Sequence, residues 1–172
     1  MPIELVRLDQ RFIHGQLIAS DALANRGVNA VIMADEALCR DSLRQLSFNV
    51  ALLAANKPVR HGATFVVPAS LPEYLREKDN GGMRFLLLFG DMAGVLQALD
   101  GGVAIAALNL GCFVSKSHEL VELYHNFKVS PEDRRTLDGL CRRIPLVYFG
   151  PPDDLRQTYI PAGAARLPNR RR

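Results

Sequence analysis

The chain has 172 residues, 48% of them hydrophobic and 23% charged, which is enough for one sizeable core and too short for two ordinary domains. Its formal net charge is +3, and subtracting the arginines near its end (Arg166, Arg170, Arg171 and Arg172) leaves a body with a charge of −1. A near-neutral body argues against a general nucleic-acid binder, which spreads lysine and arginine over one face. We therefore expect no nucleic-acid partner.

Short apolar or β-branched runs alternate with stretches of helical periodicity along the chain. The runs predict buried strands at residues 3–8, 30–34, 63–67, 85–89, 103–108 and 146–149. The helical stretches are residues 16–25, 41–55, 71–78, 92–99 and 132–142. This alternation predicts an α/β fold: a single-domain, open, mostly parallel β-sheet with helices on both faces. In such a sheet, ligands bind at the carboxyl ends of the strands.

Two helix starts carry capping patterns. Ser70 is followed by Glu73, and Ser130 by Asp133, so each serine is placed to accept a hydrogen bond from the first turn of a helix. We expect both serines to be N-caps.

Two segments are harder to interpret. In residues 112–127 the only pattern is a short helical one at 120–124, and we expect a mobile loop there. At the end of the chain, proline, glycine, alanine and arginine follow one another without periodicity, as in disordered tails. We expect residues 1–160 to form the domain and 161–172 a basic, disordered tail.

A dense polar cluster follows the first predicted strand. His14 lies where a helix is expected to begin, and free backbone amides at a helix start stabilise an anion. Gly15 would allow a close backbone approach to that anion, and Arg7 and Arg11 add fixed positive charge. Asp9 would either orient a neighbour or pair with an arginine. The cluster favours a phosphoryl group as its ligand.

A metal site is disfavoured, because two arginines would repel a cation. The other histidines, His61, His118 and His125, show no metal-ligand spacing. His118 and His125 could line the rim of the site if the chain between them were helical, although solvated side chains are the commoner case. The three cysteines contain no CxxC pair and fit reduced thiols. We expect no metal and no cofactor.

The run of residues 6–16, Val-Arg-Leu-Asp-Gln-Arg-Phe-Ile-His-Gly-Gln, resembles the segment around the phosphorylated histidine in IIB components of the mannose/fructose/sorbose family of the sugar phosphotransferase system (PTS). Further similar segments are residues 32–36, 86–89, 101–103 and 108–111, with weaker similarity over 130–133 and 144–148. The resemblance implies the sorbose-type IIB fold.

It also implies a function. His14 would accept a phosphoryl group from a histidine of a IIA protein and pass it to a sugar during uptake, which makes the chain a phosphocarrier and a protein-histidine-phosphate to sugar phosphotransferase. The residues that would surround the phosphoryl group are Arg7, Asp9, Arg11, Gly15 and Gln16. The implied partners are the IIA protein and the IIC and IID permease subunits in the membrane.

Location follows from the same reasoning. No apolar run approaches the roughly 18 residues of a membrane span, and residues 1–11 lack the apolar stretch of a signal peptide. We expect a cytoplasmic protein associated peripherally with the permease, and a homo-oligomer is compatible with the sequence.

Two alternatives stay open. Some residues near the expected site depart from the family pattern: Gln10, Gly90, Asp91 and Cys112. They motivate the first alternative, a regulatory, phosphorylation-dependent IIB paralogue without sugar transport. The second is an anion- or nucleotide-binding α/β domain, against which the missing glycine fingerprint counts.

Overall fold

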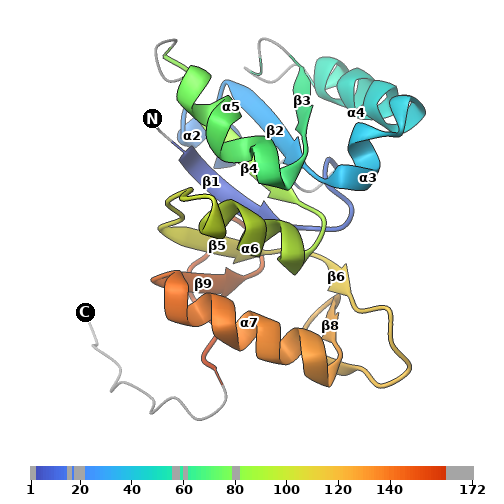
Figure 1. Cartoon of the computed structure of the whole chain (residues 1–172), viewed down its shortest axis with the longest axis vertical. Helices are drawn as coiled ribbons and strands as arrows, with labels where there is room; N and C mark the ends of the chain where they lie inside the picture. Colours follow the sequence, from blue (N-terminus) through green and yellow to red (C-terminus); the bar gives the residue numbers. More distant parts are fainter. Residues whose placement is uncertain are drawn as a thin grey trace.

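The centre of the fold is a six-stranded sheet in which every neighbouring pair of strands is parallel (Figure 1). In spatial order the strands are β3 (Ala63–Val66), β2 (Ala30–Ala34), β4 (Phe85–Phe89), β1 (Ile3–Leu8), β5 (Ala107–Leu110) and β9 (Leu146–Phe149). This structure, a computed structural model, describes residues 3–14, 17, 22–55, 59, 62–78 and 82–161. The predicted open parallel sheet is confirmed.

Helices cover both faces of this sheet, which is why its strands read as continuous apolar runs. Alternate residues of β1 point to opposite faces, so Val6 and Leu8 belong to one hydrophobic cluster and Leu5 to the other. The first cluster is closed by α5 (Leu71–Glu77), α6 (Met92–Asp100) and α7 (Pro131–Arg143). The second is closed by α2 (Ala22–Asn25), α3 (Glu36–Cys39) and α4 (Ser42–Ala54).

The order of the strands creates a crevice at the carboxyl ends of β1 and β5. After β1 the chain passes to β2 on one side of the sheet, whereas after β5 it passes to β9 on the other side. Connections that diverge in this way leave a gap between two neighbouring strands, where α/β proteins bind ligands. The segment from Asp9 to His14 begins at this point.

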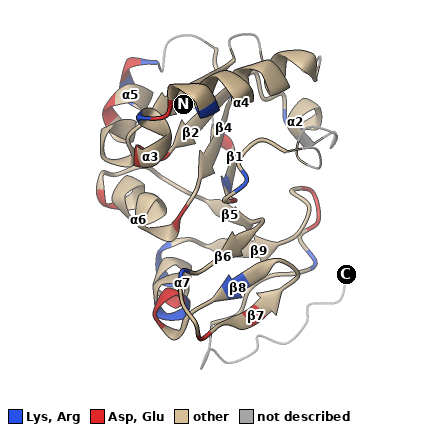
Figure 2. Cartoon of the chain, turned by 90° about the vertical axis from the view of Figure 1, so that its right-hand side faces the viewer, with Lys and Arg blue, Asp and Glu red and all other residues tan. Residues whose placement is uncertain are grey.

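A second, three-stranded sheet stands beside α7, in the order β6 (Phe113–Val114), β8 (Phe127–Val129) and β7 (Val121–Tyr124) (Figures 1 and 2). The expected loop with helical periodicity at 120–124 is therefore wrong. Five residues are too few to separate the two periods, and antiparallel pairing with β8 decides the conformation of β7. The Tyr124 ring also stacks on Phe149, with 5.1 Å between the ring centroids.

Other boundaries differ by a few residues. The strand expected at 103–108 begins only at Ala107, because the first pairing of β5 joins Ala107 to Leu146 of β9, and β1 pairs only from Asn109 onward. Val103 and Ile105 are still buried in the core. The apolar run is therefore buried from residue 103, although the strand pairing begins later. Half of the helix expected at 16–25 lies outside the described residues, and α2 confirms its last four residues. Nearly all of the tail expected at 161–172 lies outside the described residues as well.

No helix in the described part of the chain is long and apolar enough to span a membrane. Basic and acidic residues are interspersed among the elements that Figure 2 colours, without a continuous basic stripe.

The two predicted N-caps behave differently. The Ser130 hydroxyl accepts a hydrogen bond from the Asp133 amide at 3.0 Å, so it caps α7 as expected. Ser70 makes no side-chain capping bond to α5, and that prediction is wrong. Its φ of −91° and ψ of −5° are helical, because a 3₁₀ turn over Pro68–Ser70 runs directly into the helix, whereas a capping serine needs an extended backbone.

This difference predicts that Ser130→Ala lowers the free energy of unfolding by about 1 kcal/mol, because it removes a capping acceptor. Ser70→Ala is the matched control and should change it by less than about 0.5 kcal/mol, as an exposed substitution does. Urea unfolding of the two variants measures both values. Equal losses would contradict the assignment of the cap to Ser130 alone.

Candidate functional site

The site is built around one buried carboxylate. Asp9 follows β1 directly and is 0% exposed. Arg7 donates to Asp9 Oδ2 from Nη2 at 2.8 Å and from Nε at 3.1 Å. Arg11 donates to Asp9 Oδ1 from its backbone amide at 3.0 Å and from Nε at 3.1 Å. His14 Nε2 lies 3.0 Å from Asp9 Oδ2. Asp9 therefore both pairs with arginines and orients the histidine.

This arrangement keeps Asp9 ionised. Burial opposes ionisation and is the largest single influence on the carboxyl, but the hydrogen bonds from His14 and Arg11 and the charge of Arg7 outweigh it together. The net result holds the pKa of Asp9 well below its ordinary value. The carboxylate is a fixed negative charge at any physiological pH.

Arg7 is itself anchored on its far side. Its Nη1 donates to the side-chain oxygen of Asn109 on β5 and to the carbonyl oxygen of Gly150 at 3.2 Å. Asn109 is fully buried and donates to the same carbonyl at 3.2 Å. The guanidinium thus ties the end of β1 to β5 and to the residue after β9, so the carboxylate has a rigid support.

The turn that carries His14 has an unusual backbone. Phe12 has a φ of +53°, a left-handed conformation that bulky residues rarely adopt. Its amide donates to the Asp9 carbonyl at 3.0 Å, and its buried ring packs 5.9 Å from the ring of Phe48 on α4. A Cβ atom at Gly90 would lie 2.7 Å from the Phe12 ring and 2.6 Å from the Asp35 carboxylate. Because residue 90 is glycine, the Phe12 ring of this turn can occupy the space where a side chain at that position would lie.

Gly111 has a comparable role at the end of β5. A Cβ atom there would overlap the Asp9 carboxylate and the Arg7 guanidinium. The amide of Gly111 donates to the Leu8 carbonyl at 2.8 Å. The backbone therefore passes directly over the ion pair, which only a residue without a side chain permits.

Three of the residues expected to depart from the family pattern have structural roles in this chain. Gln10 bonds to Val114 through both amide atoms, accepting from its backbone amide at 3.0 Å and donating to its carbonyl at 3.2 Å. This pairing fastens the turn to the second sheet. Asp91 caps α6 by accepting from the Gly94 amide at 2.7 Å, and the Cys112 carbonyl accepts from the Gln10 amide at 2.8 Å.

A pocket of about 490 Å³ opens beside the arginines. Arg7 and Arg11 line it, together with Tyr124 at the end of β7 and with His125 and Asn126 of the turn between β7 and β8. The suggestion that His125 lies at the rim of the site agrees with this position, although β7 and the turn replace the helix that it assumed. His118 is not among the pocket residues.

The structure brings together four of the six predicted site residues: Arg7, Asp9, Arg11 and His14. Gly15 and Gln16 lie outside the described residues. Sequence reasoning missed Asn109 as a partner of Arg7. A signal was present, because an asparagine between two leucines, directly after the apolar run at 103–108, needs a polar partner if it is buried.

Within the described ranges, no group of three His, Cys, Asp or Glu side chains is placed to hold a metal ion. At the site itself, the two guanidinium groups beside Asp9 would oppose a cation.

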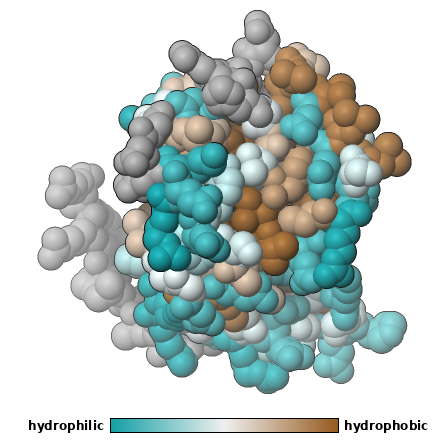
Figure 3. Space-filling model, turned by 45° about the horizontal axis from the view of Figure 1, so that its top comes forward, coloured by the Kyte–Doolittle hydropathy of each residue, from teal (hydrophilic) through white to brown (hydrophobic). Residues whose placement is uncertain are grey.

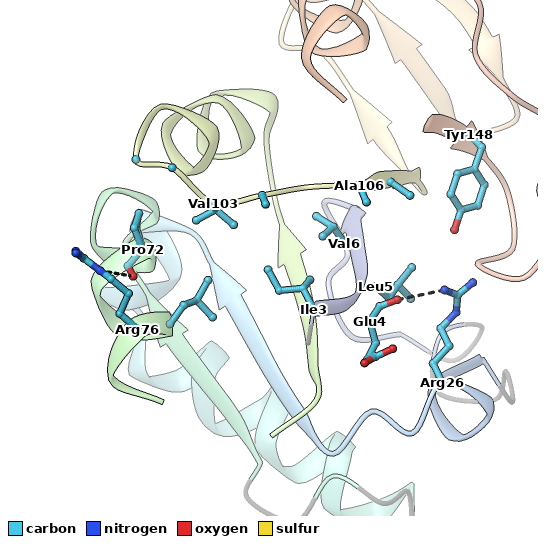
Figure 4. A pocket seen from close by; sticks show the side chains of 15 residues that line it. Ile3, Glu4, Leu5, Val6, Arg26, Pro72, Arg76, Val103, Ala106 and Tyr148 are labelled. Carbon is cyan, nitrogen blue, oxygen red and sulfur yellow. Dashed lines mark hydrogen bonds between the residues drawn. The ribbon is translucent and has the colours of Figure 1, made fainter. Parts of the chain in front are cut away.

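A second cavity, of about 540 Å³, lies near the opposite ends of β1 and β5 (Figure 4). Backbone carbonyls already engage its two arginines. Arg26 donates to the carbonyls of Glu4 at 3.1 Å and Pro152 at 3.0 Å, and Arg76 donates to that of Pro72 at 3.3 Å. This cavity therefore offers an anion less than the pocket lined by Arg7 and Arg11 does.

The sequence matches the family described as the PTS system sorbose subfamily IIB component over residues 3–143. The chain belongs to this family, and it is a IIB component of a sugar phosphotransferase system. Components of this kind are phosphotransferases that work with IIA proteins and with IIC and IID permease subunits.

Individual relatives agree. The chain is 22% identical over 161 residues to the fructose-specific EIIB component of Bacillus subtilis (strain 168), covering 93% of this chain and 94% of that protein. It is 30% identical over 111 residues to the mannose-specific EIIAB component of Escherichia coli (strain K12), covering 64% of this chain and 32% of that longer protein.

Two solved structures share the fold. The N-acetylgalactosamine-specific IIB component 1 of Escherichia coli has a TM-score of 0.78 at 19% identity and covers 92% of this chain and 99% of its own. The IIBSor domain of the sorbose permease from Klebsiella pneumoniae has a TM-score of 0.76 at 19% identity, with 92% and 93% covered.

Asp9→Asn should lower the free energy of unfolding by about 3 kcal/mol at pH 7, because it leaves Arg7 buried without its counter-charge. Since the folded-state pKa of Asp9 is depressed, its stabilisation is complete above the unfolded pKa of about 3.9 and is lost as the pH falls toward the folded value. Urea unfolding between neutral and acidic pH should therefore show the gap between wild type and variant closing below about pH 4.

The control for that experiment is Asp100→Asn, which removes an exposed ion pair with Arg143. This variant should change stability by less than about 1 kcal/mol. A gap that stays constant down to acidic pH would contradict the ionised, buried state of Asp9.

Gly111→Ala should destabilise the protein and reduce phosphoryl transfer, because the new methyl group displaces the Asp9 and Arg7 side chains. Gly139→Ala is the matched control. Gly139 lies within α7 with open space around it, so alanine should stabilise the protein by about 0.5–1 kcal/mol through helix propensity. Thermal unfolding and a transfer assay would test both expectations. Wild-type behaviour of Gly111→Ala would show that the close approach is not needed.

Proposed function

We propose that His14 is the residue of this IIB component that becomes phosphorylated, accepting the phosphoryl group from a histidine of a IIA protein and passing it to a sugar during uptake. The observation that carries the proposal is the bond between His14 Nε2 and the buried Asp9 carboxylate, which also pairs with Arg7 and Arg11. The histidine is thereby fixed beside two guanidinium groups. Its side chain remains 14% exposed, so another protein can reach it.

The orientation of the ring selects the reacting atom. A carboxylate only accepts hydrogen bonds, so the bond to Asp9 places the imidazole proton on Nε2. The lone pair of the neutral ring is then on Nδ1. We infer that Nδ1 is the nitrogen that takes the phosphoryl group.

The charges of the cluster suit an incoming phosphoryl group. Arg7 and Arg11 contribute two positive charges and Asp9 one negative charge, so the surroundings of a neutral His14 have a net charge of +1. Arg7 is buried and occupied by its protein partners, whereas the Arg11 side chain is 39% exposed. Arg11 is the guanidinium that can turn toward phosphate oxygens, where its forked donors match their geometry.

In both transfer steps, the bonds formed and broken are accounted for by the two reacting groups, without a cofactor. In the first, the Nδ1 lone pair forms the new N–P bond while the N–P bond of the donor phosphohistidine breaks and its electron pair returns to the donor ring. The phosphorylated imidazole keeps its Nε2 proton and gains positive charge, which Asp9 offsets. In the second, a sugar hydroxyl oxygen attacks phosphorus, the N–P bond breaks with its electron pair returning to His14 Nδ1, and the hydroxyl proton is released to water. Positioning and electrostatics supply the catalysis.

The site needs two partners in turn. The turn that carries His14 lies at the carboxyl edge of the sheet, so one surface can meet the IIA donor and afterwards the acceptor side. For the acceptor we propose the membrane subunits IIC and IID, with this chain as a cytoplasmic protein that associates peripherally with them.

Incubation with phosphoenolpyruvate, the general carriers and a cognate IIA protein should add one phosphoryl group, about 80 Da, to the wild-type chain and none to His14→Ala. The adduct should be acid-labile, and nitrogen-detected NMR should assign it to Nδ1. His125→Ala, which removes a histidine at the pocket rim, is the matched control and should still be phosphorylated. Equal labelling of His14→Ala would refute the proposal.

Sugar phosphorylation in membranes that contain the IIC and IID subunits separates the leading function from the regulatory alternative. Label that reaches His14 and then the sugar supports transport. Label that reaches His14 and stays there indicates a regulatory IIB paralogue.

A further inference from the structure

One helix presents an apolar face that the fold itself does not use. On α4, the side chains of Leu43, Leu46, Val50 and Leu53 are 56–73% exposed. We call these four residues the α4 seam. Figure 3 shows hydrophobic side chains gathered along the side of the molecule where Figure 1 places this helix.

The opposite face of α4 accounts for its attachment to the domain. Leu52 is buried in the core, and Phe48 packs against Phe12 of the turn that carries His14. Asn49 accepts a hydrogen bond from the Ala63 amide at 2.7 Å, which fixes the helix to β3. The α4 seam contributes to none of these three contacts, so they do not account for its four large apolar side chains.

The spacing of the α4 seam is that of a coiled-coil interface. Its residues follow one another at intervals of three, four and three, which are the a and d positions of a heptad. A stripe of this width matches a single helix laid along it at a crossing angle of about 20°. The occupant is therefore a helix.

The distribution of charged residues on α4 indicates which kind of helix can bind there. Arg44 is the sole charged residue in the sequence of α4; its side chain is exposed, and its guanidinium carbon lies 5.9 Å from the centre of the Phe48 ring, on the face turned away from the α4 seam. A helix that binds a membrane surface carries lysine and arginine beside its apolar face, and the face of α4 has none. A partner helix with charged residues beside its apolar face would find no opposite charge beside the α4 seam. An identical, uncharged face is complementary to it.

We propose that the α4 seam binds the α4 seam of a second copy of this chain, in an antiparallel pair about a two-fold axis. Intervals of three, four and three read the same in both directions. In the antiparallel pair, Leu43 therefore meets Leu53 of the second copy, and Leu46 meets its Val50. Such self-complementarity is the requirement for a two-fold dimer, and the proposal does not depend on the role of His14.

The size of the contact predicts how strong the dimer is. A helix of 13 residues is roughly 20 Å long and 10 Å wide, so two of them touch along only a few hundred Å² on each side. A permanent interface buries about 1,200 Å² or more in total. We therefore expect a dimer that forms and dissociates with concentration.

Sedimentation equilibrium of the full chain tests the proposal. Between about 10 μM and about 1 mM, the mass should rise from 19.0 kDa toward twice that value. Leu46→Glu and Val50→Glu should remain monomeric over the same range, with circular dichroism showing an unchanged fold. Leu155→Glu, which changes a side chain 51% exposed outside α4, is the matched control and should associate as the wild type does.

Cross-linking tests the direction of the pair. Chains with Leu43→Cys and chains with Leu53→Cys are mixed and oxidised, and mass spectrometry identifies the linked peptides. An antiparallel pair gives disulfides between the two variants, whereas a parallel pair links each variant to itself and overturns the proposal.

Three further outcomes would overturn it: a wild type that stays monomeric at every concentration, a dimer that persists in Leu46→Glu, and binding of the monomer to phosphatidylcholine–phosphatidylglycerol vesicles through the α4 seam. Phosphorylation of His14 in Leu46→Glu is measured alongside. A monomeric variant that still accepts the phosphoryl group separates this proposal from the proposed function.

Discussion

The site depends on one constraint, the cost of burying the Asp9 carboxylate. Removing a carboxylate from water costs several kcal/mol unless charged donors replace the lost hydration. Arg7, Arg11 and His14 supply them. Arg7 is buried as well, so it needs the oxygens of Asn109 and Gly150 for its remaining donors. Each buried charged group thus needs a further hydrogen-bond partner, and the resulting series of contacts joins β1, β5 and β9 at the edge where His14 lies.

The same constraint explains two glycines and a strained residue. The backbone after β5 must pass over the ion pair, which requires glycine at 111. The turn must bring the Arg11 amide and the His14 ring back onto one carboxylate within five residues, which places Phe12 in a left-handed conformation. Such strain persists only where surrounding contacts hold it. The Phe12 ring packs against Phe48, and the absence of a side chain at Gly90 leaves room for the ring.

Much of this could be predicted from the sequence, and the limits have physical causes. The strands of the main sheet were identifiable because both faces are covered, so their residues are uniformly apolar. The polar cluster was identifiable because its members are neighbours in the chain. Asn109 was missed because its partner Arg7 is 102 residues away. Residues 120–124 and Ser70 were misread because pairing with β8 and a preceding 3₁₀ turn decide their conformations, and short local patterns contain neither.

The arrangement also fits the opposing demands on a phosphocarrier. A IIB component must take a phosphoryl group and give it up again, so its site cannot bind phosphate with all of its positive charge. Here the charge of Asp9 cancels one of the two guanidinium charges, and the N–H groups of Arg7 already donate to Asp9 and Asn109. Among the described residues of the cluster, Arg11 and the imidazole are left for the phosphoryl group. A buried carboxylate therefore does two things at once: it fixes the reacting nitrogen, and it limits how tightly the product of the first transfer is held.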